Sequence, residues 1–122
     1  MLCIRAENLN ELAVIECKGR IVRSDSVFKL RDVVQAQPRA NTQVIALDLS
    51  EVEAISGGGL GMLAFLERWS REHNIRLKLF CPSKSVLDGL AQNRSLMNFE
   101  IASLHEMMVI LGDSDDRYSI AA

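Results

Sequence analysis

The sequence predicts a single α/β domain built on a small, mainly parallel sheet. Two observations support this fold class. Short apolar runs alternate with segments of helical period from residue 24 onward, and the run QVIALDLS (43–50) is almost continuously apolar. Strands covered on both faces have that composition, and strands that alternate with helices form parallel sheets through right-handed crossovers. The 122 residues are enough for one domain with its own core.

The first two strands are expected to form a hairpin. LCIRAEN (2–8) and ELAVIECKG (11–19) are short apolar-rich runs separated by only two residues. Gly19 is expected to end the second strand because glycine weakens a strand interior. This hairpin gives the otherwise parallel sheet a mixed character.

A first helix is expected over residues 24–37, where apolar residues recur at helical spacing. Ser24 or Ser26 would cap its N-terminus, since a serine oxygen can accept from a free amide of the first turn. The run 43–50 then provides the central strand of the sheet.

The second half of the chain continues to alternate between helical and extended patterns. Its expected elements are a helix (60–73), a strand (75–80), a helix capped by Ser83 (83–93), a strand (98–102) and a helix (103–112). The whole domain therefore has about five strands and about four helices and spans residues 1–112. The acidic, polar segment 113–122 is expected to be a frayed tail.

Composition narrows the classes of partner and ligand. The 14 Lys and Arg residues are scattered among 16 Asp and Glu residues, which argues against nucleic acid or an anionic membrane surface as the main partner. No leader pattern and no apolar run long enough to span a bilayer is present, so a cytoplasmic protein is expected. No metal is expected, because His73 and His105 lie on separate predicted helices without further ligands.

The three cysteines, Cys3, Cys17 and Cys81, follow no CxxC spacing and lie in or beside apolar runs. We expect reduced core thiols rather than a disulfide framework. No nucleophile, base and orienting group occur in a recognisable arrangement, and no cofactor is expected, so the sequence does not predict an enzyme.

The glycine cluster in AISGGGLGML (54–63) is the first place to look for function, because it follows the carboxyl end of the central strand. A phosphate-binding loop is one interpretation, but no Lys-Ser or Lys-Thr follows, and a GxGxxG pattern from Gly57 would need glycine at Met62. A structural interpretation is that Gly59 and Gly61 allow a close approach to a neighbouring strand or adopt a positive φ. The third interpretation is a protein-docking loop over residues 54–61.

A helical projection of the segment after the glycines favours docking. An apolar arc is expected to face the core, and it comprises Met62, Leu63, Phe65, Leu66 and Trp69. Leu60 and Ala64 fall among the charged positions and would form an exposed apolar patch beside the glycine loop.

The central strand and the glycine cluster together resemble the signature of a known family. VIALDLSEVEAI followed by SGGGLGML resembles the signature of the STAS family, which comprises the anti-sigma-factor antagonists and related domains of sulfate transporters. In that signature a strand of the form hhhDLSxVxxh leads to DSSGLGxL. The resemblance continues in GRIV, in LKLFCPSKSVLDGL and in NFEIASLHEMMVIL, and covers roughly residues 9–112. It implies a small sheet with helices mainly on one face, and an Asp48 that orders the following turn.

The resemblance also implies a partner switch, in which an anti-sigma factor that is a serine kinase binds the domain and phosphorylation of the second serine of DSSG breaks the complex. Here Ser56 stands at the aspartate, Gly57 at the first serine and Gly58 at the phosphorylated serine. Val22 replaces an acid that ends the family's GELD motif. Because glycine has no hydroxyl, the usual switch cannot operate at position 58.

Phosphorylation could have moved to Ser56, Ser24 or Ser26, although Ser24 and Ser26 fit helix caps and Ser56 fits a turn hydroxyl. The sequence thus predicts a non-enzymatic regulatory domain that docks an anti-sigma factor or similar protein. The expected contact residues are Ser56, Gly57, Gly58, Gly59, Leu60 and Ala64. The alternatives are a small-molecule or nucleotide sensor that uses the glycine loop and a scaffold subunit of a signalling complex.

Overall fold

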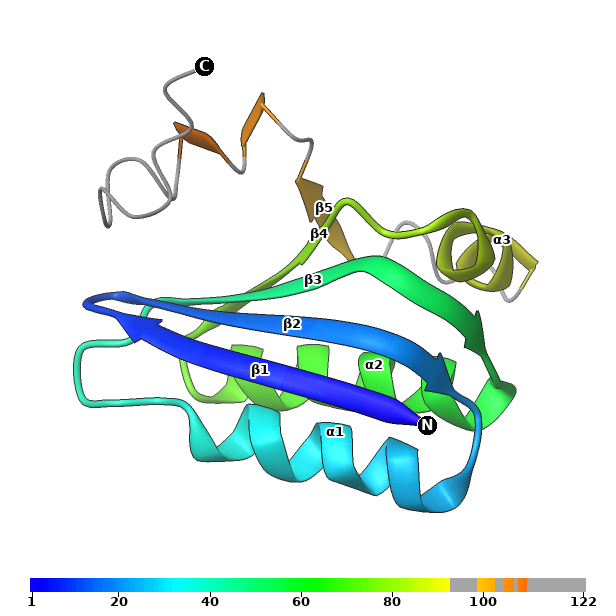
Figure 1. Cartoon of the computed structure of the whole chain (residues 1–122). Helices are drawn as coiled ribbons and strands as arrows, with labels where there is room; N and C mark the ends of the chain where they lie inside the picture. Colours follow the sequence, from blue (N-terminus) through cyan, green and yellow to red (C-terminus); the bar gives the residue numbers. More distant parts are fainter. Residues whose placement is uncertain (93–98, 103–104, 107, 110–122) are drawn as a thin grey trace.

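The computed structural model describes residues 1–92, 99–102, 105–106 and 108–109. A five-stranded sheet forms its centre, and two helices lie beneath one face of the sheet (Figure 1). In chain order the elements are β1 (Leu2–Leu9), β2 (Leu12–Ile21), α1 (Ser24–Ala36), β3 (Val44–Ile55), α2 (Gly57–Glu72), β4 (Arg76–Phe80), α3 (Lys84–Gln92) and β5 (Glu100–Ala102).

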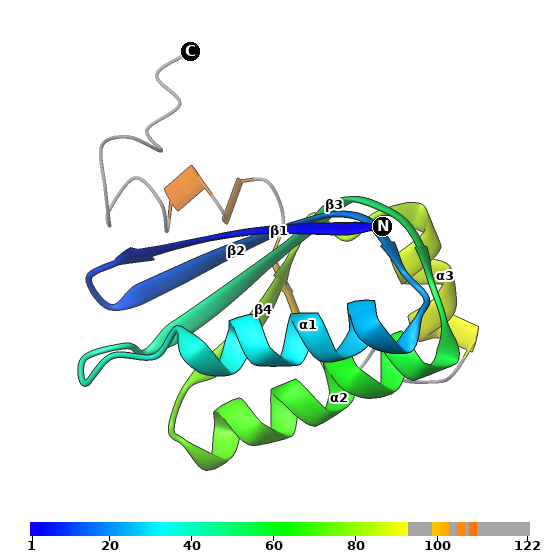
Figure 2. The same ribbon diagram turned by 60° about the horizontal axis from the view of Figure 1, so that its bottom comes forward.

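The strand order is β1-β2-β3-β4-β5, with β1 antiparallel to β2 and every later pair parallel. The expected mixed, mainly parallel sheet is thereby confirmed. Each crossover moves one strand further in the same direction, so right-handed connections place α1 and α2 on the same face. Figure 2 shows these two helices side by side beneath the sheet.

The main core lies between the sheet and these two helices. Fully buried side chains come from both layers: Leu30 and Val34 of α1, Leu63 and Leu66 of α2, and Ile15, Ile45, Leu47 and Leu79 of the strands. Burying one such side chain contributes about 1.5–3 kcal/mol relative to leaving it exposed. This packing fixes the two helices side by side on the sheet.

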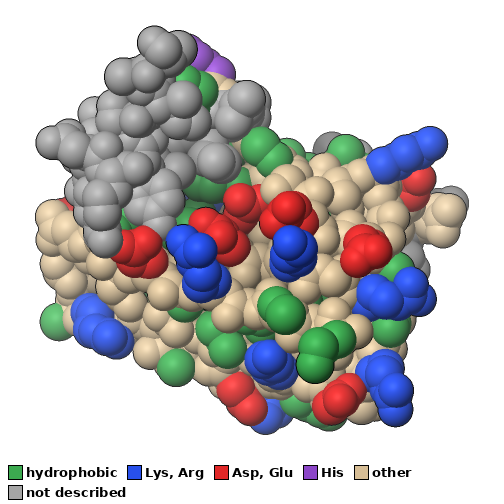
Figure 3. Space-filling model, in the orientation of Figure 1, with side chains coloured by type: hydrophobic (Ala, Val, Ile, Leu, Met, Phe, Trp, Pro, Cys, Tyr) green, Lys and Arg blue, Asp and Glu red, His purple; other side chains and the backbone are tan. Residues whose placement is uncertain are grey.

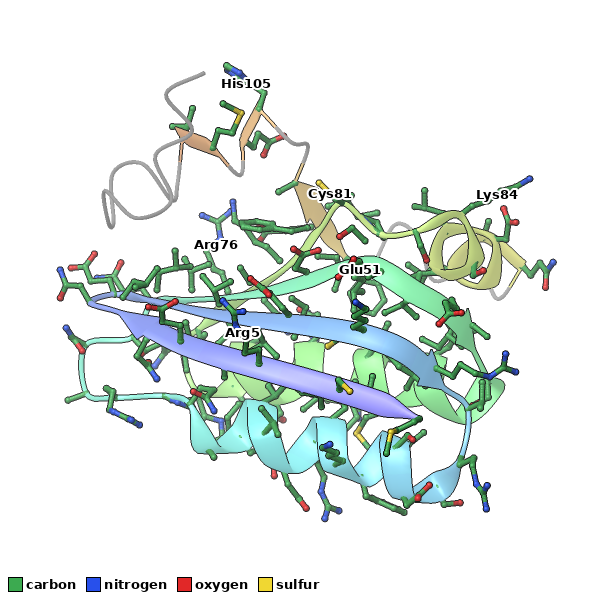
Figure 4. All side chains as sticks on the ribbon, viewed as in Figure 1. Arg5, Glu51, Arg76, Cys81, Lys84 and His105 are labelled. Atoms are coloured by element: carbon green, nitrogen blue, oxygen red, sulfur yellow. The ribbon has the colours of Figure 1, made fainter. Side chains whose placement is uncertain are left out.

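Charged side chains gather on the opposite face of the sheet (Figures 3 and 4). Arg76 and Lys78 of β4 pair with Glu100 of β5, and the shortest Arg76 Nη2 to Glu100 Oε2 distance is 2.7 Å. The hydrogen bonds from Arg76 lower the pKa of the Glu100 carboxyl. A second apolar cluster, which includes Phe80, Leu12 and Val14, lies on this same side of the sheet.

The central strand is longer than the sequence indicated, because β3 continues to Ile55 instead of ending at residue 50. Its pairing with β2 shifts twice, and each shift leaves one extra residue on β3, as in a β-bulge. At the first bulge, Asp48 Oδ1 accepts from the amide and the hydroxyl of Ser50, at 3.0 and 2.7 Å. Asp48 therefore orders a bulge within the strand rather than the turn that follows it.

Helix α3 covers the part of β3 that extends beyond β4. The β3–β4 pairing ends at Asp48. Further along β3, the hydroxyl of Ser83 donates to Val52 O at 2.7 Å, and that of Ser85 donates to Glu53 O at 2.9 Å. Ser83 Oγ also accepts from the amide of Val86 at 3.4 Å, which confirms the predicted cap of this helix.

Two predicted element ends are wrong. Gly19 does not end β2, which continues to Ile21, and its φ of +114° brings the strand so close to Met1 O that a side chain would collide with it. Neither Ser24 nor Ser26 caps α1. Arg23 occupies the N-cap without a side-chain hydrogen bond, and Arg23 O accepts from the amide of Val27 at 3.0 Å.

The predicted last helix (103–112) lies outside the described residues except for 105–106 and 108–109, and the predicted tail (113–122) lies outside them entirely. No helix in the described part of the chain is both long enough and apolar enough to cross a bilayer.

Candidate functional site

The glycine cluster is the first turn of α2, not a loop, so the predicted docking loop over 54–61 is wrong in its backbone structure. Ser56 is the N-cap, and its Oγ accepts from the amide of Gly59 at 3.1 Å. The amide of Ser56 also donates to Ile21 O at 2.9 Å, which ties the start of α2 to the end of β2. The predicted turn hydroxyl of Ser56 is therefore a helix cap.

The predicted close approach of the glycines holds at one of two positions. A Cβ on Gly59 would lie 2.7 Å from Ile21 O and 2.7 Å from Ile55 Cγ1, so a side chain there would force the backbone apart. A Cβ on Gly61 would meet no atom within 4 Å, and the structural interpretation is wrong for this residue.

The predicted exposed patch of Leu60 and Ala64 is also only half present. Leu60 is 8 % exposed and packs over Gly89 of α3, where a Cβ would lie 3.1 Å from Leu60 Cδ1. Ala64 is exposed, as predicted. Because α3 covers Leu60, the buried face of α2 includes this residue. Phe65 lies on another side of the helix and is exposed instead of lying in the core.

A groove of about 520 Å³ lies between the first turns of α1 and α2. Its lining is apolar or small: Val22, Ser24, Val27, Phe28, Ser56, Gly58, Gly61, Met62 and Phe65. Phe28 is 48 % exposed and Phe65 is 46 % exposed, so two half-exposed aromatic rings lie beside this groove. The guanidinium carbon of Arg31 lies 4.9 Å from the centre of the Phe28 ring. Exposed apolar side chains gathered at a surface make this groove a candidate interaction site.

The groove contains residues that sequence reasoning selected and residues that it missed. Ser56 and Gly58 line it as expected. Gly57 is exposed at the start of α2, whereas Gly59 and Leu60 face the interior and offer no surface to a partner. Sequence reasoning did not select Phe28. This residue directly follows Val27 and lies outside the helical spacing of the buried residues Val27, Leu30 and Val34, which indicates an exposed aromatic side chain.

The three candidate hydroxyls differ in accessibility. Ser24 is exposed and lines the groove. Ser56 is partly buried and holds the cap of α2. Ser26 is only 9 % exposed and faces inward from α1. The side chain of Ser24 is therefore the hydroxyl that a modifying enzyme could reach with the least rearrangement.

The cysteines are free thiols, and only one of them fits the predicted core thiol. Cys17 is buried, and that burial, together with the charge of Asp48, raises the pKa of its thiol to about 12. Cys3 is exposed and Cys81 is partly exposed, so the prediction is wrong for these two. No group of three or more potential metal ligands occurs within the residues that the structure describes.

The fold is similar to that of several solved anti-sigma factor antagonists. One from Mycobacterium paratuberculosis has a TM-score of 0.75 and 15% identity over 93% of this chain and 96% of that one. A putative antagonist from Thermotoga maritima has a TM-score of 0.73 and 16% identity over 89% and 94% of the two chains. Unphosphorylated SpoIIAA has a TM-score of 0.71 and 17% identity over 91% and 97%.

No family model and no curated protein matches the sequence. The structural matches show that this chain has the STAS fold of the antagonists, and the predicted fold class is confirmed. The described residues contain three complete helices, α1 to α3, and the described residues of the predicted fourth helix, 105–106 and 108–109, are also helical.

Proposed function

We propose that this chain is a non-enzymatic STAS domain that regulates signalling by docking an anti-sigma factor or a similar protein in the groove between α1 and α2. The observation that carries the proposal is the pair of half-exposed rings, Phe28 and Phe65, beside the start of α2. The fold shared with the antagonists supports the same role.

The chemistry of the groove favours a protein partner. None of the described residues that line it carries a charge, and its apolar and small residues would lose their water when a partner side chain entered. Aromatic residues are enriched among the few positions that supply most of the energy of protein interfaces. Phe28 and Phe65, on neighbouring helices, are the expected anchors of the complex.

Docking can be tested with Phe65→Asp in titration calorimetry against the anti-sigma factors of the native host. We expect the affinity to fall by at least about tenfold, because a carboxylate would be buried against the partner. Leu87→Asp on α3 is the matched control, since Leu87 is also partly exposed but does not line the groove. Equal affinities for wild type and Phe65→Asp would contradict the proposal.

Phosphorylation cannot regulate docking at position 58, because Gly58 has no hydroxyl. Gly58 keeps this part of the groove uncharged, so the domain can dock its partner at all times. Ser24 is the place where phosphate could still act, since it would add about −1.5 to −2 charges to an apolar surface. Intact mass and phosphopeptide mapping of protein from the native host test this point. Stoichiometric phosphate on Ser24 would show a displaced switch, whereas its absence under all growth conditions would support constitutive docking.

A small-molecule or nucleotide sensor is the alternative. The groove volume of about 520 Å³ suits a small ligand, and the amides of Gly57 and Gly58 belong to the unpaired first turn of α2. The described lining residues include no cation, and the nearby Arg31 guanidinium is held over the Phe28 ring, so a phosphate group would be a poor fit. Saturable micromolar nucleotide binding that Gly58→Asp abolishes would favour this alternative over docking.

A further inference from the structure

Strand β1 forms one edge of the sheet and has a second hydrogen-bonding side that faces away from β2 (Figure 1). The amide of Arg20 donates to Met1 O at 3.2 Å, which makes these two residues a hydrogen-bonded pair of the antiparallel ladder. Such pairs alternate along a strand, so the odd-numbered residues of β1 bond to β2. The backbone groups of Leu2, Ile4, Ala6 and Asn8 therefore point outward.

An independent contact supports this assignment. Lys29 Nζ of α1 donates to Leu2 O at 3.0 Å, as it can do only if that carbonyl faces away from β2. Beyond Leu2, the strand continues to Leu9 with no proline and no bulge in its pairing with β2. A long regular edge of this kind is a template for pairing with another strand.

The charged side chains of β1 favour a second copy of β1 as the strand that pairs with this edge. Arg5 and Glu7 point to the same face of the sheet because they are two residues apart. Arg5 Nε lies 3.9 Å from Glu16 Oε2 of β2 in the same chain, a long contact that leaves the side chain of Arg5 80% exposed. If two copies of β1 pair antiparallel about Ala6, Arg5 of each copy lies opposite Glu7 of the other. These are non-hydrogen-bonded positions, where facing side chains are closest.

The neighbouring registers are unfavourable for the same reason. A two-fold axis at residue 5 would place Arg5 opposite Arg5, and one at residue 7 would place Glu7 opposite Glu7. Like charges directly opposite each other destabilise a sheet, whereas opposite charges stabilise it. The sequence of β1 is thus complementary to itself in one of these three registers.

We propose that this protein forms a homodimer through antiparallel pairing of β1 with β1 of a second copy, centred on Ala6. The backbone of Ile4 bonds to that of Asn8 in the other copy, Ala6 bonds to Ala6, and the two sheets become one. The groove between α1 and α2 stays open, because α1 lies beneath β1 and β2 while the groove is on its far side, toward α2. The dimer does not depend on the proposed docking function.

Sedimentation velocity of the full chain over a wide concentration range tests the dimer, with Ala6→Pro as the disrupting variant. The outward amide of Ala6 has no partner in β2, so proline leaves the hairpin ladder intact but removes a bond of the dimer and obstructs the second strand. We expect wild type to dimerise and Ala6→Pro to remain monomeric with an unchanged circular dichroism spectrum. A wild type that stays monomeric throughout, or a folded Ala6→Pro that dimerises equally, would overturn the proposal.

Disulfide trapping tests the register without relying on proline. In a Cys3→Ser background, Ala6→Cys places two thiols across the two-fold axis at a Cα separation that a disulfide can span. Arg5→Cys and Glu7→Cys are matched controls that report the two neighbouring registers. Fastest cross-linking of Ala6→Cys supports the proposal, and faster cross-linking of either control would overturn the register.

Charge exchange tests the complementarity itself. Arg5→Glu should weaken the dimer by about tenfold, because two attractive pairs become repulsive. Adding Glu7→Arg to the same chain restores opposite charges across the interface, and the dissociation constant should return toward that of wild type. A double variant as weak as Arg5→Glu alone would contradict the pairing of these two side chains.

Discussion

The two sides of the first turn of α2 use the same residue for different reasons. On the buried side, Gly59 lies against Ile21 O and Ile55, where a Cβ would have no space. On the open side, a Cβ on Gly58 would meet only Ser56 Oγ at 3.7 Å, and one on Gly57 would meet nothing. Steric need therefore explains the glycine at 59 but not those at 57 and 58.

The difference between Gly59 and its two neighbours shows which positions of this turn packing leaves free to change. Gly59 is required for α2 to approach the end of β2, so its identity reports on packing. Gly57 and Gly58 have no such requirement, and glycine forms helices less readily than alanine. Gly58 lines the groove and Gly57 is exposed next to it, as a smooth, uncharged docking surface would need.

The largest expected effect is that of Gly59→Ala. The added methyl group would overlap a backbone carbonyl, which cannot rotate away as a side chain can, and we expect a loss of about 2–3 kcal/mol of unfolding free energy. Urea denaturation measures this loss. A variant as stable as wild type would show that Gly59 is not a packing requirement.

Removing the cap should have the next largest effect. Ser56→Ala deletes the oxygen that accepts from the amide of Gly59 and should cost about 1 kcal/mol in the same assay. Ser56→Thr is the control, because threonine also caps helices and keeps the hydroxyl that donates to Ile21 O at 3.4 Å. If Ser56→Thr were no more stable than Ser56→Ala, the cap would not be the source of the effect.

Gly58→Ala should change stability in the opposite direction from Gly59→Ala. With space for the methyl group and no positive φ at this residue, we expect a gain of about 0.5 kcal/mol from reduced chain entropy in the unfolded state. The pair of variants differs by one position, so comparing their urea midpoints tests the contrast directly. A loss of stability in both variants would contradict the predicted difference between positions 58 and 59.

The smallest effect is expected at Gly89 in α3. Alanine there gains helix propensity, but its methyl group would lie 3.1 Å from Leu60 Cδ1, so the flexible end of Leu60 must shift slightly. We expect the two terms to cancel within about 0.5 kcal/mol in urea denaturation. A loss of unfolding free energy as large as that of Gly59→Ala would mean that the end of the Leu60 side chain cannot shift to make room for the methyl group.

Apolar runs and caps were sufficient to predict most of the fold. The central strand and the cap at Ser83 follow from local patterns that the tertiary structure preserves. The end of β3 was missed because two bulges break the alternation of a strand and its last residues include Glu51 and Glu53. The start of α2 was missed because glycine has low helix propensity, which the Ser56 cap overcomes.

The groove was harder to predict than the fold, because it depends on how α1 and α2 lie beside each other. A projection of α2 alone placed Phe65 inside and Leu60 outside, the reverse of the structure. The error came from treating the sheet as the only buried surface, whereas α3 also covers the start of α2 through Gly89. Long-range contacts of this kind leave little trace in the periodicity of one helix.

The two bulges of β3 also limit how the chain can change in length. Between Asp48 and Ser56 the strand carries two residues more than its partner needs, and both are required to bring Ser56 beside Ile21 O. Deleting one of them would exchange the faces of the residues that follow and withdraw the start of α2 from the end of β2. The segment should therefore tolerate substitution at exposed positions such as Glu51 and Glu53 far better than insertion or deletion.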